Sequence, residues 1–251
     1  MAIIVLTSAG GSPGVTSTAL GLSLTWPRPV LLADCDRHPN QAVLAGYLRG
    51  LSAGGRGLGG LVQEYRSQTG DGVQQLLGQT VQLDDDPVQP RRFLPGFTNP
   101  GSALLFEHYW PRLAGQLAEL HQTDVLVDAG RLDADGLPGA LVERASQVLV
   151  LSRAGLPAVA TLRLFLPDLI AGLDEATKLG LVVVGGGRPY SATEISDSLG
   201  VRLVADLPWD PATAAVLSEG DPPPRRLLER PLWRGYQALS SQLQPLGVTC
   251  A

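Results

Sequence analysis

Residues 3–18 read Ile3-Ile4-Val5-Leu6-Thr7-Ser8-Ala9-Gly10-Gly11-Ser12-Pro13-Gly14-Val15-Thr16-Ser17-Thr18. The apolar run predicts a buried strand, the glycines predict a turn, and the hydroxyl residues after them are typical of the start of a helix. A strand that leads through a glycine-rich turn into a helix is the geometry of a phosphate-binding loop. Such a loop normally carries a lysine directly before its Ser/Thr, where this chain has Val15. The stretch therefore indicates a nucleotide site that lacks one of its main charges.

The composition fits one α/β domain that spans residues 1–251. Hydrophobic residues make up 44% of the chain and charged residues 17%, which is enough apolar material for a full core. A net charge of -5 argues against a broad basic face for nucleic acid, so we expect no direct nucleic acid partner. Two cysteines make no disulfide framework, and neither a signal peptide nor a membrane span is evident. These features predict a cytoplasmic protein.

Short apolar runs recur along the chain, and most are continuous, which is typical of parallel strands covered on both faces. They lie at 3–6, 30–33, 125–127, 148–151, 181–184 and 203–205, with a weaker candidate at 93–94. Segments with apolar residues at helical spacing lie between them, at 16–24, 58–69, 102–120, 158–173 and 193–199. This alternation predicts a doubly wound, mainly parallel sheet of about seven strands with helices on both faces. We also expect a mobile loop at 50–60 and a solvated turn at 84–90.

Three of the predicted strands end on residues that suit a ligand. The first ends on the glycine-rich loop, the second on Asp34-Cys35-Asp36, and the strand at 125–127 on Asp128. Because ligands of doubly wound sheets bind at the carboxyl ends of the strands, we expect these residues to meet at one edge.

The loop has the residues for binding phosphate and Mg²⁺, except for its cation. Gly10, Gly11 and Gly14 can adopt the angles that turn N–H groups inward, and the following helix adds a partial positive charge. The Thr16 hydroxyl can reach Mg²⁺, and Ser17 or Thr18 can cap the helix or touch phosphate. Loss of the charged partner of a bound anion costs roughly 2–5 kcal/mol, so binding can survive where fast turnover does not. The alternative is a strand–turn–helix junction without a ligand.

The three aspartates allow a functional and a structural interpretation. A carboxylate at Asp34 or Asp36 can orient a water for attack on a phosphate or join a metal shell. Asp128 ends its apolar run in the manner of an aspartate that holds Mg²⁺. Alternatively, each of them caps backbone N–H groups at the end of a strand.

With these motifs the chain resembles the MinD/ParA family of deviant P-loop ATPases over nearly its whole length. The family loop reads K-G-G-x-G-K-T-[ST], and this chain has Gly10-Gly11-Ser12-Pro13-Gly14-Val15-Thr16-Ser17 at those positions. Gly10 thus replaces the lysine that reaches the partner subunit's nucleotide, and Val15 replaces the ordinary P-loop lysine. Asp36 falls on the water-activating position of the family's D-x-D, and Asp128 falls on its Walker B aspartate. Segments 182–185 and 205–210 resemble the family's distal strands, although the asparagine that reads adenine is not evident at 185–187.

The resemblance implies a P-loop NTPase fold, ATP and Mg²⁺ as cofactors, and a homodimer. It implies a catalytic role for Asp36 and metal binding by Thr16 and Asp128. The nucleotide contacts it implies are Gly10, Gly11, Ser12, Gly14, Val15, Thr16, Ser17 and, beside the base, Pro208. The sequence of residues 11–16 and 26–32 is similar to that of an actinobacterial branch of the family. Members of this branch accompany Tad-type pilus or secretion systems, which suggests a protein partner of that kind.

Further residues bear on the missing charge and on membrane contact. Arg37, Arg131 and Arg153 each follow a predicted strand end and could replace a lysine, or they are ordinary surface arginines. The segment Pro231–Leu243 places five large apolar residues on one helical face. That face either packs on the sheet, which we expect, or binds a membrane, with recruitment to the membrane or cell pole.

Two functions compete on this evidence. The first is a degenerate family member that acts as a localisation or adaptor factor in chromosome partitioning or a Tad-type system, with little or no ATP hydrolysis. The second is an active but slow Mg-ATP hydrolase in which an arginine or a partner replaces the lysine. A dinucleotide-dependent oxidoreductase is a weaker third, because the loop lacks G-x-G-x-x-G.

Overall fold

The computed structural model describes residues 1–67, 72–86, 88–174 and 177–243. Its centre is an eight-stranded sheet with the strand order β3-β4-β2-β5-β1-β6-β7-β8. The strands are β1 Ile3–Ser8, β2 Val30–Asp34, β3 Val81–Gln82, β4 Arg91–Leu94, β5 Asp124–Arg131, β6 Gln147–Arg153, β7 Lys178–Val184 and β8 Leu203–Leu207. All neighbouring pairs are parallel except β3 and β4. The predicted doubly wound parallel fold is confirmed, with eight strands rather than about seven.

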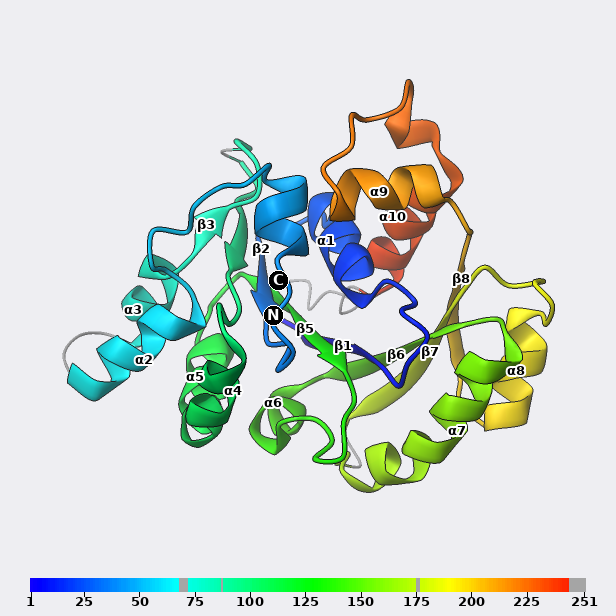
Figure 1. Ribbon diagram of the computed structural model, residues 1–251, viewed down its shortest axis with the longest axis horizontal. Helices are drawn as coiled ribbons and strands as arrows, with labels where there is room; N and C mark the ends of the chain where they lie inside the picture. The colour runs from blue at the N-terminus through cyan, green and yellow to red at the C-terminus, as the bar shows by residue number, and fades with distance from the viewer. Residues whose placement is uncertain (68–71, 87, 175–176, 244–251) are drawn as a thin grey trace, which may run out of the picture.

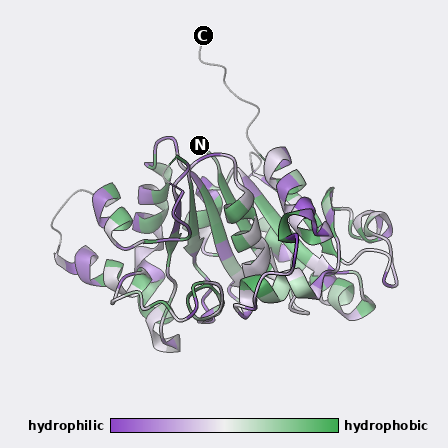
Figure 2. Ribbon diagram, turned by 90° about the horizontal axis from the view of Figure 1, so that it is seen from above, coloured by the Kyte–Doolittle hydropathy of each residue, from purple (hydrophilic) through white to green (hydrophobic). Residues whose placement is uncertain are grey.

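The central strands are apolar throughout because helices cover both of their faces. Successive side chains of a strand point to opposite sides, so Val5 and Val127 join one hydrophobic cluster while Leu6 and Leu126 join the other. Figure 2 shows the resulting hydrophobic sheet between helices whose outer faces are more polar.

The helices are α1 Val15–Thr25, α2 Leu58–Ser67, α3 Gly72–Gly78, α4 Pro100–Phe106, α5 Trp110–Ala118, α6 Gly139–Arg144, α7 Leu156–Ala171, α8 Ala192–Leu199, α9 Pro211–Ser218 and α10 Pro231–Leu243. A π-helical turn at Ala42–Tyr47 and 3-10 turns at Glu107–Tyr109 and Leu227–Glu229 join them. Helices α1, α9 and α10 cover one face of the sheet, and α2 and α4–α8 cover the other (Figure 1).

Most predicted helices are present, with shifted ends. The predicted helix at 102–120 is wrong in part, since it is divided into α4 and α5 by the 3-10 turn. Pro111 lies in the first turn of α5, where a proline suits a helix start and cannot continue the preceding helix. Helix α2 begins within the predicted loop 50–60, and the last two residues of its predicted span lie outside the described residues. The sequence did not predict β3, α3, α6, α9 or the π-helical turn.

Helix α10 packs on the sheet, as expected. Its apolar face is buried against α1 and β8, through Leu232, Trp233, Tyr236, Leu239 and Leu243. Among the described residues, no helix combines the length and the apolar character that crossing a membrane requires.

Candidate functional site

The sheet brings the three predicted strand ends together. β5 lies between β2 and β1, and Asp128 is in register with Asp34 on one side and with Leu6 on the other. Residues 9–14 connect the end of β1 to α1. The loop, Asp34, Asp36 and Asp128 therefore share one edge of the sheet, as the strand-end pattern predicted.

The backbone of the loop exposes donors at the start of α1. Gly11, Ser12 and Gly14 have φ angles of 75°, 45° and 88°, in the left-handed region that glycine adopts without strain. Gly14 is the N-cap residue and gives α1 no side-chain cap. In the described part of the chain, the N–H groups of Ser12, Gly14, Val15 and Thr16 donate to no protein acceptor. Unpaired donors at a helix N-terminus form a cradle that fits phosphate oxygens.

The side chain of Val15, the residue directly before Thr16, lies in the core. It is 7% exposed and belongs to the hydrophobic cluster under α1. Pro13 has no N–H to offer. The loop thus supplies backbone donors and a helix dipole but no cationic side chain of its own.

Thr16 and Asp128 form the pair that fits Mg²⁺. Asp128 is 1% exposed, and its Oδ1 accepts from the Gly130 N–H at 2.9 Å. Its Oδ2 is buried and accepts no hydrogen bond from the described residues. The Thr16 hydroxyl lies near enough to lower the pKa of Asp128. Burial is the main influence and raises the pKa of Asp128 to about 6. An orphaned carboxylate oxygen beside a threonine hydroxyl suits a hard cation.

The two aspartates after β2 have different surroundings. Asp34 is buried, and burial together with the Asp128 charge raises its pKa well above the ordinary value. Asp36 is half-buried, and burial raises its pKa. The His38 N–H, the His38 ring, Asn40 and Arg131 act in the opposite direction and lower it. Its carboxylate accepts from the His38 N–H at 2.8 Å. A methyl group at Gly130 would overlap this carboxylate, so glycine there lets β5 approach Asp36.

The aspartates do not form a metal centre by themselves. Within the residues described, no group of three or more His, Cys, Asp or Glu side chains is arranged to hold a metal ion. A cation at this edge would therefore take Thr16, Asp128 and oxygens from a ligand.

A cavity of about 300 Å³ adjoins the loop. Ser12, Gly14 and Ser17 line it on one side, and Pro208 and Trp209 line it on the other. The structure thus places Pro208 beside the loop. Trp209 is a residue that sequence reasoning missed, although its place directly after Pro208 was a signal for it.

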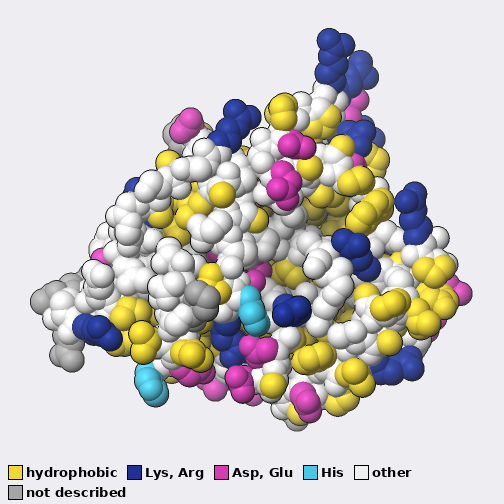
Figure 3. Space-filling view, viewed as in Figure 1, with side chains coloured by type: hydrophobic (Ala, Val, Ile, Leu, Met, Phe, Trp, Pro, Cys, Tyr) yellow, Lys and Arg dark blue, Asp and Glu magenta, His cyan; other side chains and the backbone are white. Residues whose placement is uncertain are grey.

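The three candidate arginines have different partners. Arg37 donates to Asp133 at 2.7 Å and to the Gly136 carbonyl, so it is engaged away from the loop. Arg131 is exposed and acts electrostatically on Asp36. Arg153 donates from Nη2 to the Ser12 carbonyl of the loop at 3.1 Å. In the view of Figure 3, basic, acidic and histidine side chains lie near the middle of the molecule, and hydrophobic side chains gather over α7 and α8.

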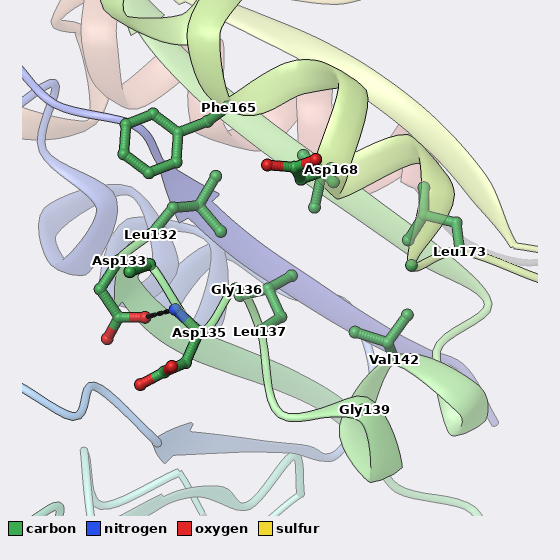
Figure 4. Close-up of a pocket in the computed structure, with 13 residues that line it drawn as sticks. Leu132, Asp133, Asp135, Gly136, Leu137, Gly139, Val142, Phe165, Asp168 and Leu173 are labelled. Atoms are coloured by element: carbon green, nitrogen blue, oxygen red, sulfur yellow. Dashed lines mark hydrogen bonds between the residues drawn. The ribbon is translucent and has the colours of Figure 1, made fainter.

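A second cavity, of about 280 Å³, lies between segment 132–139 and α7 (Figure 4). Asp133, Asp135 and Asp168 line it together with apolar side chains such as Phe165, and its lining includes no Lys, Arg or His. It therefore suits an anion poorly. The loop cavity also has acidic residues in its lining, Asp210 and Glu219, but Asp210 is paired with Arg230 and the lining includes Arg153, so it is the better phosphate site.

Comparison with known proteins identifies the fold. Neither a protein-family model nor a curated protein matches the sequence. The cell division ATPase MinD of Pyrococcus furiosus matches in structure with a TM-score of 0.71 and 20% identity, over 96% of this chain and 97% of that one. A ParA family ATPase of Chlorobium tepidum matches with a TM-score of 0.72 and 12% identity, over 97% and 98%. The septum site-determining protein MinD of Pyrococcus horikoshii, complexed with Mg-ADP, gives 0.66 and 19%, over 98% and 96%. At these identities the likeness shows the fold, which is that of the MinD and ParA P-loop ATPases.

Proposed function

We propose that this chain is a degenerate, nucleotide-binding member of the MinD/ParA family that hydrolyses ATP little or not at all. In this proposal residues 1–251 form one domain that dimerises and works as a localisation or adaptor factor. Its partner would be a protein of a chromosome-partitioning or Tad-type pilus or secretion system. It would act in the cytoplasm, with recruitment to the membrane or cell pole through that partner.

The observation that carries the proposal is the contrast between Val15 and the rest of the loop. Val15 is packed in the core, while the neighbouring N–H groups remain free to donate. The catalytic charge of the loop is therefore missing although its phosphate cradle is intact. An enzyme that depends on that charge in the transition state loses turnover before it loses binding.

The residues present fit ATP and Mg²⁺. Residues 10–17 would hold the phosphates, Thr16 and Asp128 would hold the metal, and Pro208 would lie beside the base. Bound Mg²⁺ would supply charge neutralisation at the phosphates. The Mg-ADP of the similar Pyrococcus horikoshii protein supports this assignment.

The second candidate is a slow Mg-ATP hydrolase, and the contact of Arg153 with the loop favours it. In that case Asp36 would orient the attacking water. Binding of a fluorescent ATP analogue, with and without Mg²⁺, and phosphate release under the same conditions separate the candidates. We expect micromolar, Mg²⁺-dependent binding without phosphate release above the rate in buffer.

Phosphate release that Asp36→Asn abolishes would establish the hydrolase instead. Release that survives Asp36→Asn would show that Asp36 is not catalytic. Absence of binding at millimolar nucleotide would contradict both candidates and leave a fold kept for protein contacts alone.

A further inference from the structure

The loop needs a cation from outside itself if it binds a nucleotide. Arg37 is engaged by Asp133 and Gly136, and Arg131 acts electrostatically on Asp36 and lines neither cavity beside the loop. Arg153 remains, and it contacts the loop directly.

Arg153 reaches the loop because of the strand order. It is the last residue of β6, which pairs with β1, and β1 leads into the loop. Its guanidinium donates to the Ser12 carbonyl and lies 4.7 Å from the centre of the Trp209 ring. In the described part of the chain it makes no ion pair with Asp or Glu, so its charge is not neutralised by the protein.

The same side chain lies between two cavities. One is the loop cavity of about 300 Å³, where Arg153 is the single Lys or Arg among the lining residues. The other, of about 350 Å³, is lined by Gly11 and Arg188 and shares Arg153, Val184 and Trp209 with the first. A charged group at this junction would meet a ligand that enters from either side.

The chemistry of arginine suits this place. A guanidinium has five donors in a planar fork. In Arg153, the Nη2 group donates one hydrogen bond to the Ser12 carbonyl. Stacking on an aromatic ring holds the plane without consuming the remaining donors. The fork is therefore available to two oxygens of a phosphate group.

We propose that Arg153 is the phosphate-binding cation of this chain and takes the place of the lysine absent at position 15. Its ligand is the phosphate chain of a nucleoside diphosphate or triphosphate, and Trp209 orients the guanidinium toward it. This inference rests on the nucleotide binding that both candidates under the proposed function share, since it assigns a residue to the same site.

The test is the affinity for Mg-ADP, measured by titration calorimetry, of the wild type and four variants. Arg153→Gln keeps a donor for the Ser12 carbonyl but removes the charge, and Arg153→Ala removes both. We expect each to bind at least about 30-fold more weakly, as for loss of a charged partner. Arg153→Lys keeps the charge without the fork and should stay within about 10-fold of the wild type. The matched control is Arg163→Ala, since Arg163 is also exposed and donates to a carbonyl, that of Ser198, but lines neither cavity.

A second measurement uses Trp209, which is 44% exposed while Trp26, Trp110 and Trp233 are at most 8% exposed. Titration with inorganic pyrophosphate should change the intrinsic fluorescence of the wild type, because the guanidinium moves on the ring. Arg153→Gln and Trp209→Phe should abolish the change.

The outcomes separate this inference from the proposed function. Loss of affinity in Arg153→Gln with retention in Arg153→Lys supports it. Wild-type affinity in Arg153→Gln would overturn it and leave the proposed function intact, with Arg153 only holding the loop. Failure of the wild type to bind Mg-ADP would overturn both.

Discussion

Asp34 and Asp128 are in register on β2 and β5, and both are buried. Burial and the neighbouring charge raise the pKa of Asp34, and burial raises that of Asp128 to about 6. The folded protein thus holds these protons more tightly than the unfolded chain does. The contribution of these two carboxyls to the free energy of unfolding should therefore be most favourable below about pH 4 and be lost progressively as the pH rises through about 6.

Asp34→Asn should raise the free energy of unfolding at pH 7, because it removes a buried carboxyl group whose pKa is raised in the folded protein. The amide oxygen can still accept from the Asp36 N–H, as Oδ1 of Asp34 does at 3.2 Å. The gain should disappear near pH 4, and urea denaturation at the two pH values measures it. Asp197→Asn, at an exposed position of α8, is the control and should change nothing. A loss of stability at both pH values would show that the charge of Asp34 is compensated in the folded protein.

Val15→Lys tests whether the loop still places a phosphate where a lysine would meet it. We expect Mg-ADP affinity to rise at least about 10-fold through the restored charge. Stability should fall by about 1.5–3 kcal/mol because an apolar side chain leaves the core. Calorimetric titration and thermal unfolding measure the two effects.

The control for this variant is Val15→Ala, which vacates the core without adding a charge. It should lose stability and gain no affinity. An unchanged affinity in Val15→Lys would mean that ligand phosphates do not lie within reach of position 15.

At the scale of the element, the sequence predicted those helices that a local pattern of residues marks. Helix α1 followed from the loop motif, and α7 and α8 followed from their apolar spacing. Helix α9 was missed because its apolar residues show no clear face, and because distant residues fix its start. Asp210 caps α9 through Thr213 and is held by Arg230, twenty residues later in the chain. A contact across that separation leaves no periodic signal.

Helix α10 stabilises the fold in our interpretation, and Leu239→Ala tests it. Leu239 is 1% exposed against α1, so the truncation should cost about 2–5 kcal/mol in the free energy of unfolding. Gln242→Ala, on the exposed side of the same helix, should leave the free energy of unfolding within about 0.5 kcal/mol of the wild type.

Binding to a membrane is tested separately. Sedimentation with vesicles that contain phosphatidylglycerol should leave the wild type in the supernatant. A stable Leu239→Ala protein that differs from the wild type only in vesicle binding would instead make α10 a membrane helix.

At the scale of the whole molecule, the edge that carries the loop was predictable and the contents of its cavity were not. Parallel strands bring their carboxyl ends together, so the meeting of Asp34, Asp128 and the loop followed from the order of the motifs. The wall formed by Trp209 and α9 depends on which face of the sheet each helix covers. The side-chain rotamer of Arg153 over Trp209 depends on packing in three dimensions. Neither is encoded in a local stretch of sequence.

Exposed apolar side chains gather around this same edge. Leu156, Tyr190 and Trp209 follow the carboxyl ends of β6, β7 and β8, and Leu104 lines a cavity with His38 after β2. Large apolar side chains that share one face are typical of a surface covered by another protein. A second copy of the chain, brought to this face by a bound nucleotide, would cover them.

We therefore expect sedimentation velocity to show a monomer without nucleotide and a dimer with Mg²⁺ and a non-hydrolysable ATP analogue. Leu156→Ser should weaken the dimer at least about 10-fold, because truncating an anchor at an interface costs more than about 1 kcal/mol. Its thermal stability should be unchanged, since Leu156 is 61% exposed in the single chain. Leu228→Ser is the matched control, because Leu228 is 63% exposed and lies in the 3-10 turn Leu227–Glu229, away from these strand ends. A dimer that forms equally in Leu156→Ser would place the contact elsewhere and leave this apolar edge for a different protein partner.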